Sequence, residues 1–266
     1  MHSGDRTQGV NEVTAAQRSD GGFVIAATVM QSLLHTDGVL GDFRVIEASD
    51  PYQPTEVSDW DLRREFESSD KYSPIDPVDW HTHSAWLDPE GTAAWLATWD
   101  GGVVMLDLSD INAPELVAHI PIELGGEGNA HTVGVDQELG LLIRNDERLV
   151  AESSDGATVT WGAQTIYDVT DAGSPSRLAT FATAGATTDD GAADYSGYFS
   201  AHEVVVSDGI EYVSWYSDGL RIVDLGEPSQ PEEIGSFVPA PATDPLGFWR
   251  TASGETSFPM VWGVSL

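Results

Sequence analysis

One motif recurs four times along this chain at nearly constant spacing, and it constrains the fold more than any other feature. In each copy a short apolar run ends in an acidic residue, and a proline follows seven positions later. The pairs are Glu47 and Pro54, Asp107 and Pro114, Asp168 and Pro175, and Asp224 and Pro231. Successive acidic residues lie 60, 61 and 56 positions apart. Four copies in register predict a repeat architecture.

Each copy is expected to form one small β-sheet. In the clearest copy, Ala201 to Val238, four short runs of β-branched and aromatic residues are separated by Gly, Asp, Ser and Pro. Such runs are too short for helices and suit strands. One four-stranded sheet cannot cover both of its faces, so successive sheets must pack on each other. The predicted sheets span approximately residues 10–57, 79–120, 130–183 and 201–238, and residues 260–266 begin a further one.

The predicted fold class is therefore all-β, a β-propeller of four-stranded antiparallel blades within a single domain. A propeller ring typically has about four to eight blades. The repeats either close as a four-bladed ring, with Trp262 to Leu266 supplying a shared strand, or belong to a larger ring. The larger ring is favoured because the first repeat already has its own opening run, Asn11 to Ala15.

Two connections are expected to lie outside the sheets. Asp61 to Pro77 is charged and then proline-bearing, and we interpret it as a loop rather than a short helix at Leu62 to Phe66. Asn145 to Thr160 is a polar, acidic insertion between two strands of the third repeat. Loops of this kind lie on the surface and often carry recognition functions, so we expect this insertion to be exposed.

The charge of the chain excludes some classes of partner. Forty-four acidic and 11 basic residues give a formal net charge of −33. This charge argues against nucleic acid and against anionic membranes as partners. The acidic residues are spread through the turns, which is typical of a solubilising, halophilic surface. No run approaches the length of a membrane span, and Met1 to Gln8 lack the apolar core of a secretory signal.

A histidine opens three of the repeats: His83, His131 and His202. The opening strand of each propeller blade lines the central channel, so these histidines and Trp262, which opens the last run, are the expected channel or ligand residues. His81 lies two positions before His83 and points to the same side of its strand. His81, His83, His131 and His202 together suit copper, zinc or iron, with open positions for catalysis. The alternative is that each histidine bonds the backbone of a neighbouring blade.

The acidic residue of each repeat has a simpler interpretation than metal binding or acid–base catalysis. A carboxylate at the start of a turn accepts backbone N–H groups, and the proline seven positions later begins an edge strand. We therefore predict a structural role for Asp107, Asp168 and Asp224. The tryptophans Trp86, Trp95, Trp99 and Trp215 are expected to pack between blades rather than to stack on carbohydrate.

The third run of each repeat resembles the LVIVD repeat family, and Leu220-Arg221-Ile222-Val223-Asp224 is the nearest copy. The next copy is Val103-Val104-Met105-Leu106-Asp107, whereas Glu47 replaces the aspartate in the first repeat. The resemblance covers roughly residues 20–266 and implies propeller blades in exported or surface-attached bacterial and archaeal proteins without an agreed activity. A more distant resemblance to the selenium-binding protein family implies histidines beside the channel and copper-dependent methanethiol oxidation.

Two functions follow from these patterns. The first is a noncatalytic propeller at the cell surface or exterior that binds a protein, a glycan or a small molecule through its loops and channel mouth. The second is a metal-dependent oxidoreductase with a histidine-lined channel. Metal analysis of the purified protein beside a His131→Ala/His202→Ala variant separates the two. The sequence does not identify the ligand, the number of blades in the ring or the oligomeric state.

Overall fold

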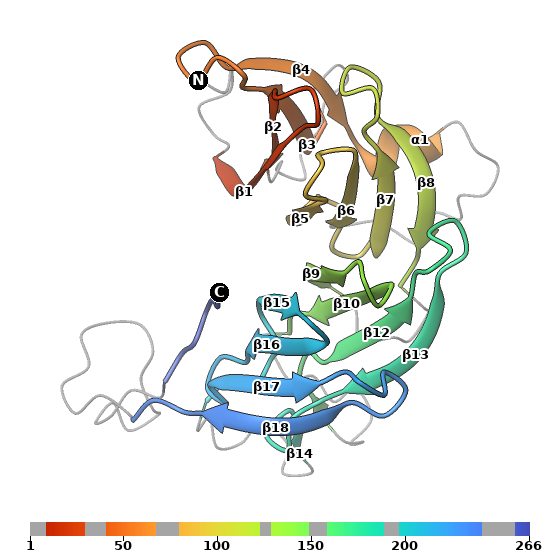
Figure 1. Ribbon diagram of the computed structural model, residues 1–266. Helices are drawn as coiled ribbons and strands as arrows, with labels where there is room; N and C mark the ends of the chain where they lie inside the picture. The colour runs from red at the N-terminus through yellow and green to blue at the C-terminus, as the bar shows by residue number, and fades with distance from the viewer. Residues whose placement is uncertain are drawn as a thin grey trace. The chain divides into compact units, whose positions relative to one another are not determined.

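The computed structural model describes residues 9–29, 41–67, 80–122, 129–148, 159–188, 197–240 and 259–266 (Figure 1). The chain divides into two compact units, residues 1–124 and 125–266, and each unit is described by itself. Each unit contains two four-stranded antiparallel sheets. The all-β class and the four antiparallel sheets predicted from the sequence are confirmed.

Unit 1 contains the first and second sheets. The first sheet consists of β1 (Val10–Gln17), β2 (Phe23–Val29), β3 (Phe43–Glu47) and β4 (Thr55–Trp60) in that order. The short helix α1 (Leu62–Glu67) follows. The second sheet consists of β5 (Ser84–Leu87), β6 (Ala93–Ala97), β7 (Val103–Asp107) and β8 (Glu115–Ile120).

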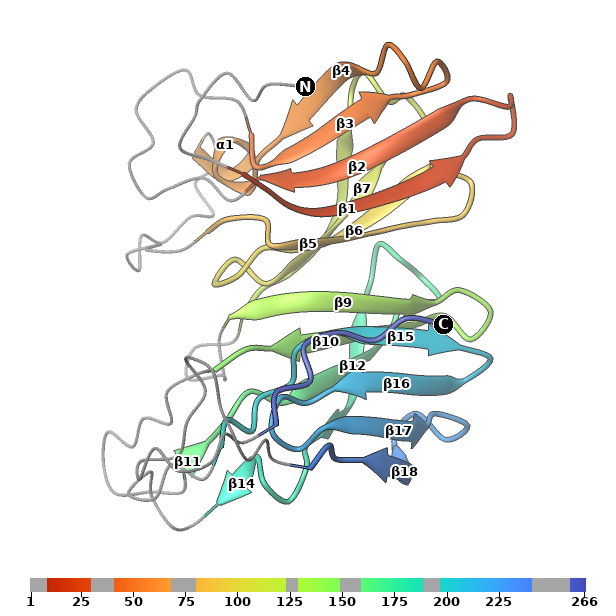
Figure 2. The same ribbon diagram turned by 90° about the vertical axis from the view of Figure 1, so that its left-hand side faces the viewer.

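Unit 2 contains the third and fourth sheets, and the strand order of the fourth can be followed in Figure 2. The third sheet consists of β9 (Ala130–Asp136), β10 (Leu141–Asp146), β12 (Gln164–Asp168) and β13 (Ser176–Phe181). The fourth consists of β15 (Val204–Ser207), β16 (Ile210–Ser214), β17 (Leu220–Asp224) and β18 (Glu232–Phe237). A separate ribbon pairs β11 (Val159–Thr160) with β14 (Thr187–Thr188).

The recurring acidic residues stabilise turns, as predicted. Asp107 Oδ1 accepts the backbone N–H of Ser109 at 2.7 Å, and Asp168 and Asp224 accept those of Thr170 at 2.9 Å and Gly226 at 2.7 Å. Glu47 does the same with the N–H of Ser49 at 2.9 Å. The hydrogen bonds from Ser109 and Thr170 lower the pKa of Asp107 and Asp168. The motif prolines Pro54, Pro114, Pro175 and Pro231 each directly precede the outermost strand of a sheet.

Neighbouring sheets within a unit share an apolar core. In unit 1, Val24, Ala26, Phe43 and Val45 of the first sheet pack in one cluster with Ala85, Leu87 and Ala94 of the second. In unit 2, Leu141, Ile143 and Ile166 of the third sheet cluster with Val204, Val223 and Leu225 of the fourth. The same face of the earlier sheet is therefore covered in both units, which is the arrangement expected for stacked repeats.

Side chains at the start of one sheet also bond the backbone at the start of the next. Asn11 Nδ2 donates to the carbonyl of His83 at 2.8 Å in unit 1. In unit 2, His131 Nδ1 lies 3.2 Å from the carbonyl of His202, and His202 Nδ1 donates to the carbonyl of Trp262. These bonds are the structural alternative that the sequence left open for the histidines. We call them the inter-sheet latches.

A second donor reinforces each of these acceptor carbonyls. Thr28 Oγ1 donates to His83 O at 2.9 Å, Asn145 Nδ2 to His202 O at 3.1 Å, and Ser214 Oγ to Trp262 O at 2.8 Å. Thr28, Asn145 and Ser214 occupy the same register position on the second strand of their sheets. Trp262 therefore takes the position that a histidine has in the repeats before it.

Three expectations about the segments between sheets were wrong. Residues 62–67 form α1 instead of a loop, because Asp61 Oδ1 accepts the N–H of Arg63 at 2.7 Å and Leu62 and Phe66 pack on the core of unit 1. Trp262 to Leu266 form no strand, and only Val261 makes an isolated bridge, to Tyr216. The predicted insertion begins later than Asn145, since Asn145 and Asp146 belong to β10 and are buried. Residues 149–158 of that insertion lie outside the described residues.

Gly219 is a position where glycine is required. Its φ is +82°, and an added Cβ would lie 2.2 Å from the carbonyl oxygen of Phe237. Gly102 occupies the equivalent turn of the second sheet, with the same φ and a Cβ position 2.2 Å from Ile120 O. We expect Gly219→Ala to lower the free energy of unfolding by about 1–3 kcal/mol, because it adds backbone strain and a clash with main chain. Urea denaturation measures the change.

Gly173 provides the matched control for this prediction. The nearest atom to an added Cβ there is Asp171 Oδ1 at 3.5 Å, and its φ lies outside the left-handed region. Gly173→Ala should therefore leave the unfolding midpoint nearly unchanged. Equal midpoints for Gly219→Ala and the wild type would contradict the requirement for glycine.

Candidate functional site

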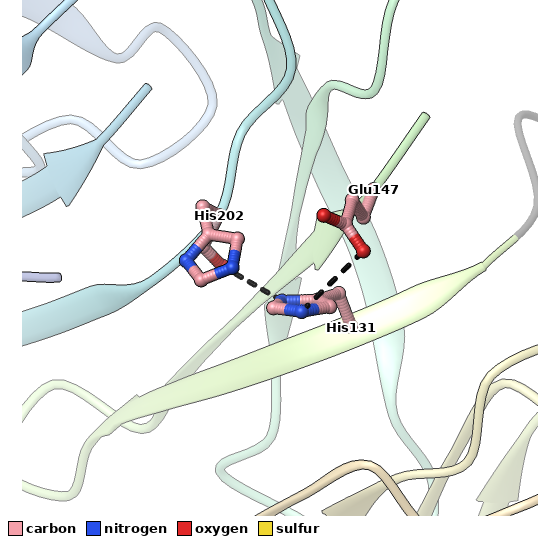
Figure 3. A group of neighbouring side chains, drawn as sticks. All are labelled: His131, Glu147 and His202. Atoms are coloured by element: carbon pink, nitrogen blue, oxygen red, sulfur yellow. Dashed lines mark hydrogen bonds and ion pairs between the residues drawn. The ribbon is translucent and has the colours of Figure 1, made fainter. Parts of the chain in front are cut away.

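Three metal-binding side chains converge in unit 2: His131, Glu147 and His202 (Figure 3). Each contributes one ligand atom, and these atoms all lie within 4.8 Å of one another. The rings of His131 and His202 have centroids 4.3 Å apart, and His131 Nε2 lies 3.5 Å from Glu147 Oε2. All three residues are buried. We call this group the His–Glu site.

The strands of two sheets position the three side chains. His131 is the second residue of β9, and Glu147 directly follows β10, the strand paired with β9. His202 lies just before β15, which opens the fourth sheet. The backbone of Glu147 is fixed by its N–H, which donates to Asn129 O at 3.0 Å. The site therefore rests on paired backbone at the point where the third and fourth sheets meet.

The latches determine which nitrogen of each ring carries a proton. A carbonyl oxygen only accepts hydrogen bonds, so His131 Nδ1 and His202 Nδ1 must donate to His202 O and Trp262 O. In a neutral imidazole the other nitrogen, Nε2, then carries the lone pair. This is the arrangement usual for metal-ligating histidines, whose second nitrogen donates to a carbonyl or carboxylate.

Aromatic side chains surround the donors. Tyr216 Oη donates to Glu147 Oε1, and the Tyr216 ring lies with its centroid 4.8 Å from that of His202. The Trp262 ring centroid lies 5.1 Å from His202 and 5.3 Å from Tyr216. Tyr216 is fully buried, whereas Trp262 is 47% exposed. The site is thus bordered by the buried side chain of Tyr216 on one side and by the exposed indole of Trp262 beside it.

Burial decides the charge states in the site. It raises the pKa of Glu147, which the hydrogen bond from Tyr216 partly opposes. It lowers the pKa of His202 to about 4, against the opposing effect of the bond to Trp262 O. Burial, together with the neighbouring Glu147 carboxylate, raises the pKa of Tyr216 well above its ordinary range. His202 is therefore a neutral imidazole at pH 7.

His81 and His83 lie in unit 1 and make a different set of contacts. Their ring centroids are 6.1 Å apart, and Trp99 covers both, with centroids 5.1 Å from His81 and 5.4 Å from His83. His81 is buried and His83 is half-buried. The structure thus brings His131 and His202 together and, separately, His81 and His83. The convergence of all four imidazoles at one axis stays a prediction.

Glu147 was missed from the sequence because it lies in the segment interpreted as a surface insertion. The sequence feature that identifies Glu147 is its position within the repeat. Trp99 lies two positions after Ala97 in the second sheet, and Tyr216 lies two positions after Ser214 in the fourth. Ala97 and Ser214 each pair with the residue that follows the opening histidine of their sheet. Glu147 stands two positions after Asn145, which pairs with Thr132 in the same way. A carboxylate where the second and fourth repeats have an aromatic residue marks the third repeat.

Two His nitrogens and one carboxylate form a donor set that suits zinc or iron(II), and copper also accepts imidazole ligands. Such a set leaves coordination positions open for water or substrate. The other chemistry available to the site is a proton shared between His131 and Glu147. No helix in the described part of the chain has the length and hydropathy of a membrane span.

Comparison with known proteins supports the repeat and the fold. Residues 200–238 match the model of the LVIVD repeat family, and the comparison with curated proteins found no match. The solved structure of Sqt1 from Saccharomyces cerevisiae aligns with a TM-score of 0.53 at 9% identity, covering 96% of this chain and 60% of that one.

Two further solved structures align over most of the chain with lower TM-scores. The β-propeller domain of Cps50 (Swd1) from Myceliophteria thermophila aligns with a TM-score of 0.45 at 11% identity, covering 82% of this chain and 57% of that one. A nidogen/laminin complex gives 0.45 at 13% identity, covering 81% of this chain and 59% of that one. The chain thus spans between 57% and 60% of the length of these proteins.

These comparisons concern the fold and the repeat. Sequence identities this low do not support assigning an activity to this chain. The fold is that of a β-propeller, as the sequence predicted. The resemblance to the LVIVD repeat family is confirmed over residues 200–238, the fourth repeat. The resemblance to the selenium-binding protein family stays an expectation.

Proposed function

Because residues 200–238 are an LVIVD repeat in a chain with a β-propeller fold, we propose that this is a noncatalytic binding protein whose ligand is another protein. One observation carries the proposal. The face of the fourth sheet formed by Ile210, Tyr212, Leu220, Ile222 and Phe237 is apolar and only partly covered. We call it the trailing face.

The register of the repeats shows what such a face does elsewhere in the chain. The trailing face corresponds to Val24, Ala26, Phe43, Val45 and Trp60 of the first sheet, which the second sheet covers. Trp60 is 5% exposed, whereas Phe237 at the equivalent position is 65% exposed. Exposed apolar surface of this kind marks interaction sites.

The third sheet gives the same result within unit 2. Its equivalent residues Leu141, Ile143 and Ile166 are buried against the fourth sheet. The surface that fits the trailing face is an apolar sheet face, as the next repeat presents within each unit. Aromatic and β-branched side chains on both sides would supply the contact.

Substituting Phe237 and Ile222 by aspartate tests this proposal. When immobilised on a column, the Phe237→Asp/Ile222→Asp variant should fail to retain partner proteins that the immobilised wild type retains. Cross-links from those partners should map to β17 and β18. Leu139→Asp is the matched control, because Leu139 is 44% exposed in the β9–β10 turn, away from the trailing face. Equal capture by wild type and the double variant would refute the proposal.

The cellular location is part of the same proposal. The LVIVD resemblance supports a position at the cell surface or exterior, and the formal charge of −33 supports a protein that stays soluble in high salt. Labelling of intact cells with an impermeant reagent, followed by fractionation, tests the location. Protection of the protein until the cells are lysed would reject it.

A second candidate function, a metal-dependent oxidoreductase, is favoured by the His–Glu site. A two-histidine, one-carboxylate donor set leaves coordination positions for a substrate and for dioxygen. The assay is oxygen consumption by metal-loaded protein with a small thiol, compared with His202→Ala. A wild type that holds metal stoichiometrically but consumes no oxygen would reject this candidate and leave the binding function standing.

A further inference from the structure

The geometry points to a site for a single transition-metal ion, zinc or iron(II), bound by His131 Nε2, His202 Nε2 and Glu147 Oε2. The inference does not depend on the protein partner proposed above, because it stands on contacts in a different part of unit 2. Two of its ligands were expected from the sequence with His81 and His83. The carboxylate ligand, the ring tautomers and the supporting residues come from the structure.

The first argument is that an imidazole nitrogen and a carboxylate oxygen face each other across a short gap. His131 Nε2 lies 3.5 Å from Glu147 Oε2, while the other ring nitrogen, Nδ1, donates to His202 O. A cation between the two atoms would be attracted to both of them. The His202 ring, with its centroid 4.3 Å from that of His131, brings a second imidazole to the same point.

The second argument is that every ligand is already oriented by a neighbour. His131 and His202 are each held through Nδ1 by a main-chain carbonyl, and Glu147 is held through Oε1 by the Tyr216 hydroxyl. Metal sites commonly show this second layer of hydrogen bonds, which fixes the ring orientation and raises ligand basicity. Thr132 Oγ1 and Asn145 Nδ2 also donate to His202 O, the acceptor that orients His131.

The third argument concerns size. Zinc–ligand bonds of about 2.0–2.1 Å place the donor atoms of a tetrahedral site about 3.3 Å apart. His131 Nε2 and Glu147 Oε2, 3.5 Å apart, already have about this spacing, and each of the three side chains offers one ligand atom within 4.8 Å of the others. The remaining coordination positions would be filled by water.

Isothermal titration of the purified, chelator-treated chain with Zn²⁺ at pH 7 tests the site. We expect one ion per chain, retained through gel filtration, and a tetrahedral Co²⁺ absorption spectrum when Co²⁺ replaces Zn²⁺. Glu147→Gln keeps the shape of the side chain and its acceptor for Tyr216, yet it should weaken binding more than about 100-fold, since even supporting residues contribute about 10–100-fold. His202→Ala should abolish the Co²⁺ spectrum.

Further variants separate ligand loss from damage to the fold. Tyr216→Phe should weaken binding about 10–100-fold without removing a ligand. Glu138→Gln, an exposed carboxylate in the β9–β10 turn, should bind like the wild type, and so should His119→Ala on β8. Circular dichroism of every variant checks that it is folded.

Two outcomes would overturn the inference. One is a folded wild type that binds no Zn²⁺, Co²⁺ or, under anaerobic conditions, Fe²⁺. In that case ¹⁵N spectra should show His131 protonated on both nitrogens, which means that a shared proton fills the gap to Glu147. The other is Zn²⁺ binding that Glu147→Gln and His202→Ala leave unchanged, which would place the ion elsewhere. Neither outcome affects the test on Phe237 and Ile222.

Discussion

Replacing Trp215 by alanine is expected to lower the free energy of unfolding of unit 2 by about 3–5 kcal/mol. Trp215 follows β16 and has no exposed surface. It packs in a cluster with Trp161, Ala201 and Val213, and the Phe181 ring lies edge-on to it with centroids 5.7 Å apart. Truncation to alanine would leave a large cavity among residues that both sheets of unit 2 hold in place.

A hydrogen bond adds to that cost. The indole Nε1–H of Trp215 donates to the carbonyl of Phe199 at 2.6 Å, and alanine leaves this acceptor without its donor. Guanidinium denaturation followed by circular dichroism measures the loss. Tyr52→Ala is the control, because Tyr52 is 92% exposed and its truncation should cost almost nothing. Similar midpoints for the two variants would contradict the contribution of this cluster to the stability of unit 2.

Glu211→Gln is expected to stabilise the protein by about 3 kcal/mol at pH 8 and to remove a pH dependence of stability. Glu211 lies on β16 with no exposed surface, and Gln164 Nε2 donates to its Oε1. Burial raises its pKa from 4.5 to about 7, and the Gln164 hydrogen bond only partly opposes the rise. Gln164 Nε2 also donates to Asn145 Oδ1 at 2.7 Å.

The sign of the pH dependence follows from the raised pKa. Between pH 4.5 and about 7 the folded state holds a proton on Glu211 that the unfolded state releases. Stability is therefore fully present below pH 4.5 and falls as the pH rises to about 7, above which the cost stays constant. Thermal melts of wild type and Glu211→Gln from pH 4 to pH 9 measure the difference. Parallel curves for the two proteins would contradict the assignment.

The register of the repeat also explains why Glu211 is unusual. The equivalent positions of the other sheets hold Ile25, Ala94 and Leu142, which are apolar. Gln164 likewise stands where the other sheets have Phe43, Val103 and Leu220. A buried polar pair thus replaces apolar contacts between the third and fourth sheets alone.

The regular part of the fold was predictable from the sequence because it depends on short-range patterns. The apolar runs have the period of strands, and the acidic residue and proline of each repeat fix a turn and an edge strand at constant offsets. Asp107 and Pro114 show the principle, since each acts through bonds within its own turn or strand. Four repetitions of one local rule predicted four sheets.

The departures from prediction depend on contacts that are distant in sequence. The helix α1 is only six residues long, so its stability comes from burying Leu62 and Phe66 rather than from its own sequence. Trp262 to Leu266 match the opening run of a repeat, yet no second strand of their own pairs with them in the described residues.

The candidate site was only partly predictable for the same reason. His131 and His202 were found because they occupy equivalent positions in successive repeats. Glu147 comes together with them only when β10 is extended by two residues past its expected end, which a polar composition concealed. Counting positions within the repeat identifies Glu147, whereas the composition of the segment does not.

The inter-sheet latches also affect how the repeats can vary in evolution. Each latch has a side-chain donor but a main-chain acceptor, so the amino-acid type matters at only one of its two positions. Asparagine or histidine can serve as donor, and any residue can serve as acceptor, as Trp262 does. Duplicated copies can therefore diverge in their opening residue without losing adhesion to the preceding copy, and a histidine that makes the latch through Nδ1 keeps Nε2 for chemistry.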